Sequence, residues 1–168
     1  MQCFTTAEDS ARRAARRIVR DAWGAWIEKY PWRHYVTLTD RYANSPRSLL
    51  NQGKAFIRRL ESRGRGRVDY VAVVEGSRHG FPHLHMLLNG TERLTTCEIQ
   101  RQWRLGFSEI RRYNAARAAA YYIVKELGRS DHDPDLFDFR LARDDDQICR
   151  HEPGTPPREQ SSAFDVRR

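Results

Sequence analysis

Two short apolar runs joined by a glycine-containing loop constrain the fold of this 168-residue chain more than any other feature. Residues 68–75 and 82–88 are apolar and short, and the first run is rich in valine, which is typical of strands. The loop between them, residues 76–81, holds two glycines and is short enough to join antiparallel neighbours. We therefore expect a β-hairpin inside the fold.

The remaining segments alternate between helical and strand patterns. Further strands are expected at 33–39, 107–113 and 136–141. Helices are expected at 7–30, 45–62, 91–104 and 115–127, because their apolar residues recur at helical spacing. Hairpin strands with helices between the other strands predict an α+β fold, with an antiparallel sheet packed by helices on one side.

Size, composition and charge narrow the class of protein. A chain of this length with 39% hydrophobic residues is expected to be one globular domain. No apolar run is long enough for a membrane span and the first residues lack a signal-peptide core, so a cytoplasmic protein with no membrane partner is expected. The three scattered cysteines, Cys3, Cys97 and Cys149, fit a reducing compartment. The net charge of +8 indicates a polyanionic partner, most often nucleic acid.

Arginine carries most of this charge, since only three of the 30 basic residues are lysines. The planar guanidinium can bond two phosphate oxygens at once. The candidates for DNA contact are Arg12, Arg16, Arg17, Arg20, Arg78 and Arg117. The helix at 7–30 could lie along a DNA backbone, or its arginines could simply be solvated.

A His-x-His pair stands on the third expected strand. Side chains at i and i+2 of a strand share a face, so His83 and His85 project together. Glu75 ends the preceding strand and would lie opposite or diagonal to them across the hairpin. Two imidazoles and a carboxylate make a plausible three-ligand site for zinc, magnesium or manganese, with His79 as a spare ligand. A lone His-x-His, by contrast, is usually surface or core decoration.

The alanine-rich helix at 115–127 carries the candidate nucleophile. Tyr122 lies beside its apolar stripe, and Lys125 follows one turn later. A tyrosine hydroxyl, with an ordinary pKa of about 10, needs a nearby cation or metal to attack phosphorus. Tyr121 is the alternate nucleophile, but it points further from the stripe. Both tyrosines could instead be packing residues.

Three ordered motifs resemble those of the HUH-superfamily rolling-circle replication initiators, the Rep proteins. They are Val36-Thr37-Leu38-Thr39, then Glu75 with His83-Leu84-His85-Met86-Leu87-Leu88, and then Tyr122-Ile123-Val124-Lys125. The resemblance implies a sheet of ferredoxin-like or RRM-like type and an endonuclease domain at 1–128. That domain comprises the basic helix 7–30 and a motif-bearing core 33–127, and 129–168 is a partly flexible extension.

The resemblance also implies a reaction. Magnesium or manganese would be held by His83, His85 and Glu75. Tyr122 would attack single-stranded DNA or an origin hairpin of a plasmid or phage and stay joined to the 5′ phosphate, with Lys125 assisting. The sequence contains no Gly-rich phosphate loop, so a host helicase is an expected partner.

Three alternatives stay open. A single-tyrosine HUH transposase would use the same chemistry. A non-catalytic nucleic-acid-binding module would use the basic charge with stacking residues such as Tyr35, Trp103 and Phe107. A zinc-stabilised structural protein would unfold when its metal is removed.

Overall fold

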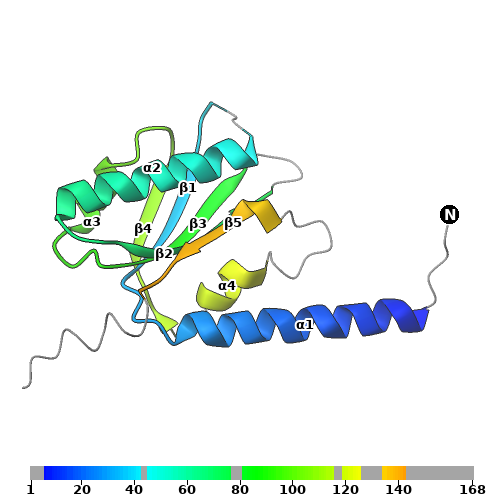
Figure 1. Cartoon of the computed structure of the whole chain (residues 1–168). Helices are drawn as coiled ribbons and strands as arrows, with labels where there is room; N and C mark the ends of the chain where they lie inside the picture. The colour runs from blue at the N-terminus through cyan, green and yellow to red at the C-terminus, as the bar shows by residue number, and fades with distance from the viewer. Residues whose placement is uncertain (1–5, 43–44, 77–80, 116–118, 126–133, 143–168) are drawn as a thin grey trace, which may run out of the picture.

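A five-stranded antiparallel sheet forms the centre of the computed structural model (Figure 1). The structure describes residues 6–42, 45–76, 81–115, 119–125 and 134–142. The strands are β1 (His34–Thr39), β2 (Asp69–Glu75), β3 (His83–Asn89), β4 (Ser108–Arg112) and β5 (Phe137–Arg140). All five predicted strands are present, which confirms the α+β class.

The strand order is β4-β1-β3-β2-β5, and every neighbouring pair is antiparallel. With α2 (Pro46–Gly64) between β1 and β2 and α3 (Thr96–Arg101) between β3 and β4, the first four strands have the β-α-β-β-α-β order of ferredoxin-like folds. The expected hairpin is the β2–β3 pair, in which Glu75 lies opposite His83 and Val73 opposite His85. β5 adds an edge strand beside β2 and follows the short 3-10 turn η3 (Pro134–Leu136).

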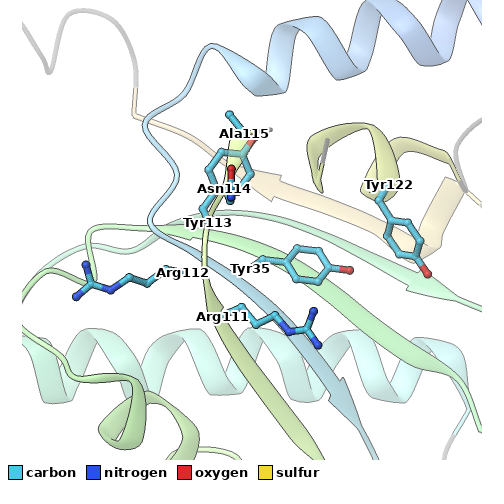
Figure 2. Close-up of a pocket in the computed structure, with 7 residues that line it drawn as sticks. All are labelled: Tyr35, Arg111, Arg112, Tyr113, Asn114, Ala115 and Tyr122. Atoms are coloured by element: carbon cyan, nitrogen blue, oxygen red, sulfur yellow. The ribbon is translucent and has the colours of Figure 1, made fainter. Parts of the chain in front are cut away.

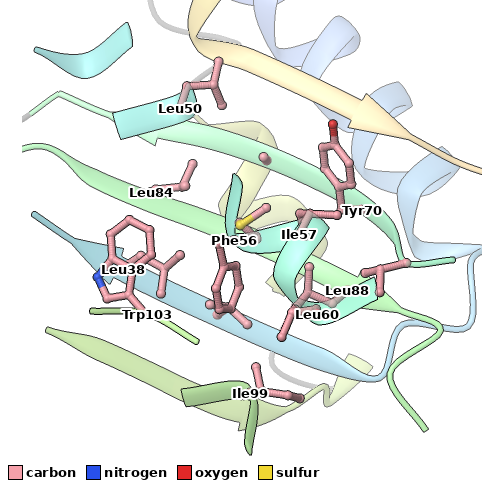
Figure 3. Close-up of a cluster of buried hydrophobic side chains, with 14 of the residues drawn as sticks. Leu38, Leu50, Phe56, Ile57, Leu60, Tyr70, Leu84, Leu88, Ile99 and Trp103 are labelled. Atoms are coloured by element: carbon pink, nitrogen blue, oxygen red, sulfur yellow. The ribbon is translucent and has the colours of Figure 1, made fainter. Parts of the chain in front are cut away.

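Helices cover both faces of the sheet, so the prediction of helices on one side is wrong. One core lies under α2 and α3 and includes Phe56, Leu84 and Ile99 (Figure 3). A second core lies on the opposite face under α1 (Thr6–Glu28) and α4 (Ala119–Lys125) and includes Ile27, Leu87 and Ile123. The physical reason is already in the sequence, because the interiors of β2 and β3 are continuous apolar runs rather than alternating ones.

The helices begin where their capping residues allow. The Ser45 side chain caps α2 and Pro46 occupies its first turn, as predicted. The helix expected at 91–104 is shorter, because Thr95 and Glu98 form a capping box that starts α3 only at Thr96. Gly106 lies beyond the helix in a turn so close to β1 that a Cβ there would be 2.5 Å from the Thr39 carbonyl oxygen.

The long helix α1 has two unlike halves. Its C-terminal half packs on the second core through Ile27 and Trp23, where Trp23 makes edge contacts with Trp26 and Phe137. Its N-terminal half extends past the sheet (Figure 1), and residues 8–19 are exposed. No helix in the described part of the chain is long and apolar enough to cross a membrane.

Candidate active site

The candidate site lies on the sheet face that carries α4. Strand alternation places His83 and His85 of β3 on this face, while Leu84 and Met86 enter the opposite core. β1 pairs with β3 so that Thr37 stands opposite His85, and β2 brings Glu75 opposite His83 from the other side. Three neighbouring strands therefore contribute polar side chains to one spot.

Glu75 is the hub of this spot. Its Oε2 accepts hydrogen bonds from His85 Nε2 at 3.0 Å and from the Tyr122 hydroxyl at 3.1 Å. Its Oε1 forms an ion pair with Lys125 Nζ at 3.6 Å. Burial alone would raise the pKa of Glu75, but the hydrogen bonds from His85 and Tyr122 and the charge of Lys125 outweigh it and lower the pKa. Glu75 is therefore an ionised carboxylate near neutral pH.

His85 is held on both ring nitrogens. Its Nδ1 lies 2.9 Å from the Tyr35 hydroxyl and 3.2 Å from Thr37 Oγ1. Because a carboxylate only accepts, Nε2 carries the proton shared with Glu75, and in the neutral ring Nδ1 accepts from a hydroxyl; this tautomer is assigned from the hydrogen bonds. Burial lowers the pKa of His85 more than Glu75 raises it, so the ring is neutral near pH 7.

His83 lies at the rim of the site. Its Nδ1 donates to the Phe81 carbonyl at 2.7 Å, which points to Nε2 as its metal-binding nitrogen. The two imidazoles are nearly parallel, with ring centroids 6.3 Å apart. Within the described residues, no three His, Cys, Asp or Glu side chains are already arranged around a metal position. Two neutral imidazoles and a carboxylate nevertheless form a donor set that suits a divalent cation.

α4 positions the tyrosine and the lysine. Ala120, Ile123 and Val124 are buried and fix the helix against the sheet. Tyr122 is 42% exposed, and its ring stands edge-on to His85 with centroids 5.2 Å apart. Lys125 Nζ lies 4.9 Å from the centre of the Tyr122 ring, which is within cation–π range. The phenol thus faces both a carboxylate and a cation while remaining open to solvent.

A cavity of about 850 Å³ adjoins the exposed side of Tyr122 (Figure 2). It lies between α4 and the edge strand β4. Figure 2 shows the Tyr35 hydroxyl and the Arg111 guanidinium directed toward the Tyr122 side, while Arg112 points away. Its lining residues are Tyr35, Arg111, Arg112, Tyr113, Asn114, Ala115 and Tyr122. The site is therefore open to a ligand much larger than a metal ion.

Residues 33–131 match the model of a family of replication-associated proteins, the ORF2 family. The chain belongs to that family. The matched segment covers more than half of the chain and contains all five residues of the site, from Glu75 to Lys125. No curated protein and no solved structure matches the chain significantly. Membership places the chain among replication-associated proteins, and α1 lies outside the matched segment.

The structure of this ORF2-family member brings together five predicted site residues, although it does not test their roles. Glu75, His85, Tyr122 and Lys125 contact one another as described, and His83 stacks on His85. Tyr121 lies on α4, but its side chain is outside the described residues, as are Arg78, His79, Arg117, the expected helix end at Gly128 and residues 143–168.

The predicted arginines of α1 lie apart from the catalytic cluster. Arg12, Arg16 and Arg17 are exposed on the projecting half of the helix. Asp21 pairs with Arg17 at 3.7 Å and with Arg20 at 2.8 Å.

Three residues near the site were not predicted in the places they occupy. No role was predicted for Thr37 or Arg111, and Tyr35 was expected only as a stacking residue. The available signal for Tyr35 and Thr37 was alternation along β1, which places both on the face of Thr39. Alternation alone does not show which strand lies beside β1, so it could not connect these hydroxyls to His85.

Proposed function

We propose that this protein is an HUH-type endonuclease that nicks and rejoins single-stranded DNA to initiate rolling-circle replication of a plasmid or phage. The observation that carries the proposal is the contact of one carboxylate, Glu75, with a histidine, a tyrosine and a lysine, all within 3.6 Å. This cluster occurs in a replication-associated family. That association favours an initiator over a transposase.

His83, His85 and Glu75 would hold a magnesium or manganese ion. The donor set supports this assignment, since Glu75 is ionised and His85 is neutral, the protonation states that metal ligation requires. Tyr35 and Thr37 hold the far side of the His85 ring, as partners of metal-binding histidines usually do. When bound, the ion would polarise the scissile phosphate and offset its charge.

Tyr122 supplies the nucleophile in this proposal. Its oxygen attacks phosphorus, the bond from phosphorus to the 3′ oxygen breaks, and the DNA stays joined to Tyr122 through its 5′ phosphate. The proton of the phenol has an acceptor in Glu75, which already takes its hydrogen bond. The released 3′ oxygen leaves as a hydroxyl. Rejoining is the reverse attack of that hydroxyl, with the proton returning to Tyr122.

Lys125 offsets negative charge beside the nucleophile. Its ammonium lies next to both the Tyr122 ring and Glu75, so it can stabilise the phenolate and the phosphate as charge develops. Arginines of α1 would contact the DNA backbone at a distance from the cleavage point. Strand separation would come from a host helicase or from a target that is already single-stranded.

A covalent-adduct assay tests the proposed function. Full-length protein is incubated with randomised single-stranded DNA and manganese and separated on a denaturing gel. We expect a shifted band that disappears with EDTA, with Tyr122→Phe and with His85→Ala. DNA binding without an adduct in every lane would sink the nuclease proposal and favour the non-catalytic binding module. Unfolding in EDTA would instead support a structural zinc site.

A further inference from the structure

The cavity beside Tyr122 is explained by the two unlike halves of the sheet face that carries the site. Near β5 the face is apolar, with Val71, Val73 and Leu87 buried under α1 and α4. Near β4 the register places Arg111 opposite Tyr35 and Glu109 opposite Thr37, so this half is polar. The cavity lies on this polar half, beside the catalytic cluster.

From this cavity, we propose a subsite for the nucleotide that neighbours the scissile phosphate, with Arg111 contacting its phosphate and Tyr113 stacking on its base. The inference rests on the proposed function, because it takes single-stranded DNA as the substrate. Tyr122 forms one wall, so whatever fills the cavity lies next to the nucleophile. No carboxylate is among the described residues that line it, whereas two arginines are, so the lining favours an anionic ligand.

Arg111 is placed to reach a phosphate. Its side chain is 57% exposed, and it is directed toward the Tyr122 side of the cavity in Figure 2. One of its amines donates to Glu109 at 2.5 Å, which fixes the side chain along β4. A guanidinium has five N–H donors in a planar fork, more than one carboxylate can accept. Arg111 can therefore keep this ion pair while binding a phosphate oxygen.

Tyr113 is placed to stack on a base. Its ring borders the cavity beside Tyr122 and also a second cavity of about 520 Å³ that reaches Arg33. Its hydroxyl is buried and has no hydrogen-bond partner within the described part of the chain, so it points inward rather than toward a ligand. Tyr35 packs on His85 with centroids 5.9 Å apart, which commits that ring to the catalytic cluster. A stacked base has an open face only when it is unpaired, so the site suits a single strand.

Binding measurements on wild-type full-length protein in EDTA separate the two contacts without any chemistry. The probes are fluorescein-labelled oligodeoxythymidylate of about 12 nucleotides and an abasic oligomer of equal length. We expect Arg111→Gln to weaken both and to lower the salt dependence, log K against log salt, by about 0.7. Tyr113→Leu should weaken binding of the thymidylate roughly tenfold and leave the abasic oligomer unchanged.

Two further variants keep the test decisive. Arg58→Gln removes an equal charge from exposed α2, on the opposite face, and should leave the salt slope unchanged. Tyr113→Phe keeps the ring and should retain full affinity even if Tyr113→Leu is poorly folded. Equal slopes for Arg111→Gln and Arg58→Gln, or equal losses on both oligomers for Tyr113→Leu, would overturn the subsite. If adducts never form but the Arg111 and Tyr113 effects persist, the nuclease proposal fails and the subsite stands.

Discussion

At the scale of single residues, His85 connects the sheet to the chemistry. Its ring is 5% exposed and is fixed at Nδ1 by hydroxyls and at Nε2 by Glu75. Metal on Nε2 would displace that proton and require Nδ1 to become the donor. The Tyr35 hydroxyl can accept such a bond as readily as it donates one now. Burial raises the pKa of Tyr35 to about 12, so the phenol stays protonated through this exchange.

Replacing Tyr35 by Phe should therefore weaken metal binding. We expect the manganese concentration for half-maximal adduct formation to rise about ten- to a hundredfold, because the ring of His85 loses one of its outer hydrogen-bond partners. Tyr42→Phe is the matched control, since Tyr42 is an exposed tyrosine whose hydroxyl accepts from Arg41. An unchanged manganese requirement in Tyr35→Phe would show that Thr37 alone positions the ring.

Lys125 should act on rate rather than on assembly of the site. Lys125→Met is expected to slow single-turnover adduct formation about a hundredfold, as loss of one group that stabilises transition-state charge usually does. Lys125→Arg should recover part of the rate, because it keeps the charge but not the compact ammonium. Lys29→Met changes an exposed lysine after α1 and serves as the control. Equal rates for Lys125→Met and the control would remove Lys125 from the mechanism.

How much of the site could be predicted depended on the range of each contact. Glu75 facing the histidines follows from strand alternation and one hairpin, because both are local. The bond from Tyr35 to His85 requires β1 to pair beside β3, although they are about fifty residues apart in the chain. The bond from Tyr122 to Glu75 requires α4 to pack on that same face. Neither placement is encoded in local periodicity.

At the scale of elements, the edge strand β5 is held by a polar network on the face away from the site. The Tyr70 hydroxyl of β2 donates to Asp138 of β5 at 2.7 Å, and Lys54 of α2 pairs with Asp138 at 3.2 Å. Arg140 of β5 donates to Glu61 of α2 and to the Val68 carbonyl. These bonds tie β5 to α2 across the first core.

Tyr70→Phe should lower the free energy of unfolding by about 2 kcal/mol, since it removes a hydrogen bond to a carboxylate. Burial first, and then the contact with Asp138, raise the pKa of Tyr70 well above its ordinary value. This contribution is therefore complete below about pH 10 and is lost as pH rises toward the folded-state pKa. Urea titrations of wild type and variant should differ at pH 7 and converge in strong alkali. A constant difference across pH would contradict this assignment.

Element boundaries and layers show where local reasoning fails. The Thr95–Glu98 capping box was present in the sequence and would have started α3 correctly, but the apolar residues upstream suggested a longer helix. The apolar interiors of β2 and β3 indicated burial on both faces, yet they were interpreted as one-sided. The element types themselves were predictable because each segment has a strong period.

At the scale of the whole molecule, charge and catalysis are separated in space. The projecting half of α1 carries arginines beyond the sheet, while the reaction site lies under α4 (Figure 1). Binding of single-stranded DNA should therefore depend on α1 even when cleavage is prevented. Changing Arg12, Arg16, Arg17 and Arg20 together to Gln should reduce the salt slope of binding, by about 0.7 for every phosphate that the helix no longer neutralises.

A variant with the same loss of charge on the other side of the molecule is the control. Arg58, Arg63, Arg101 and Arg104 are exposed on or beside α2 and α3. If their replacement by Gln lowers the slope as much as the α1 variant does, the arginines of α1 contribute only general charge. That result would assign α1 a structural role through Trp23 and Ile27.

The central claim is that Tyr122 carries the DNA during the reaction, and peptide mapping of the trapped adduct tests it most directly. The adduct formed with manganese is digested with nuclease and protease, and the modified tyrosine is located by mass spectrometry. We predict a nucleotide phosphate on Tyr122, with Tyr121 unmodified in the same peptide. A phosphate on Tyr121, on Tyr35 or on a residue outside α4 would contradict the mechanism.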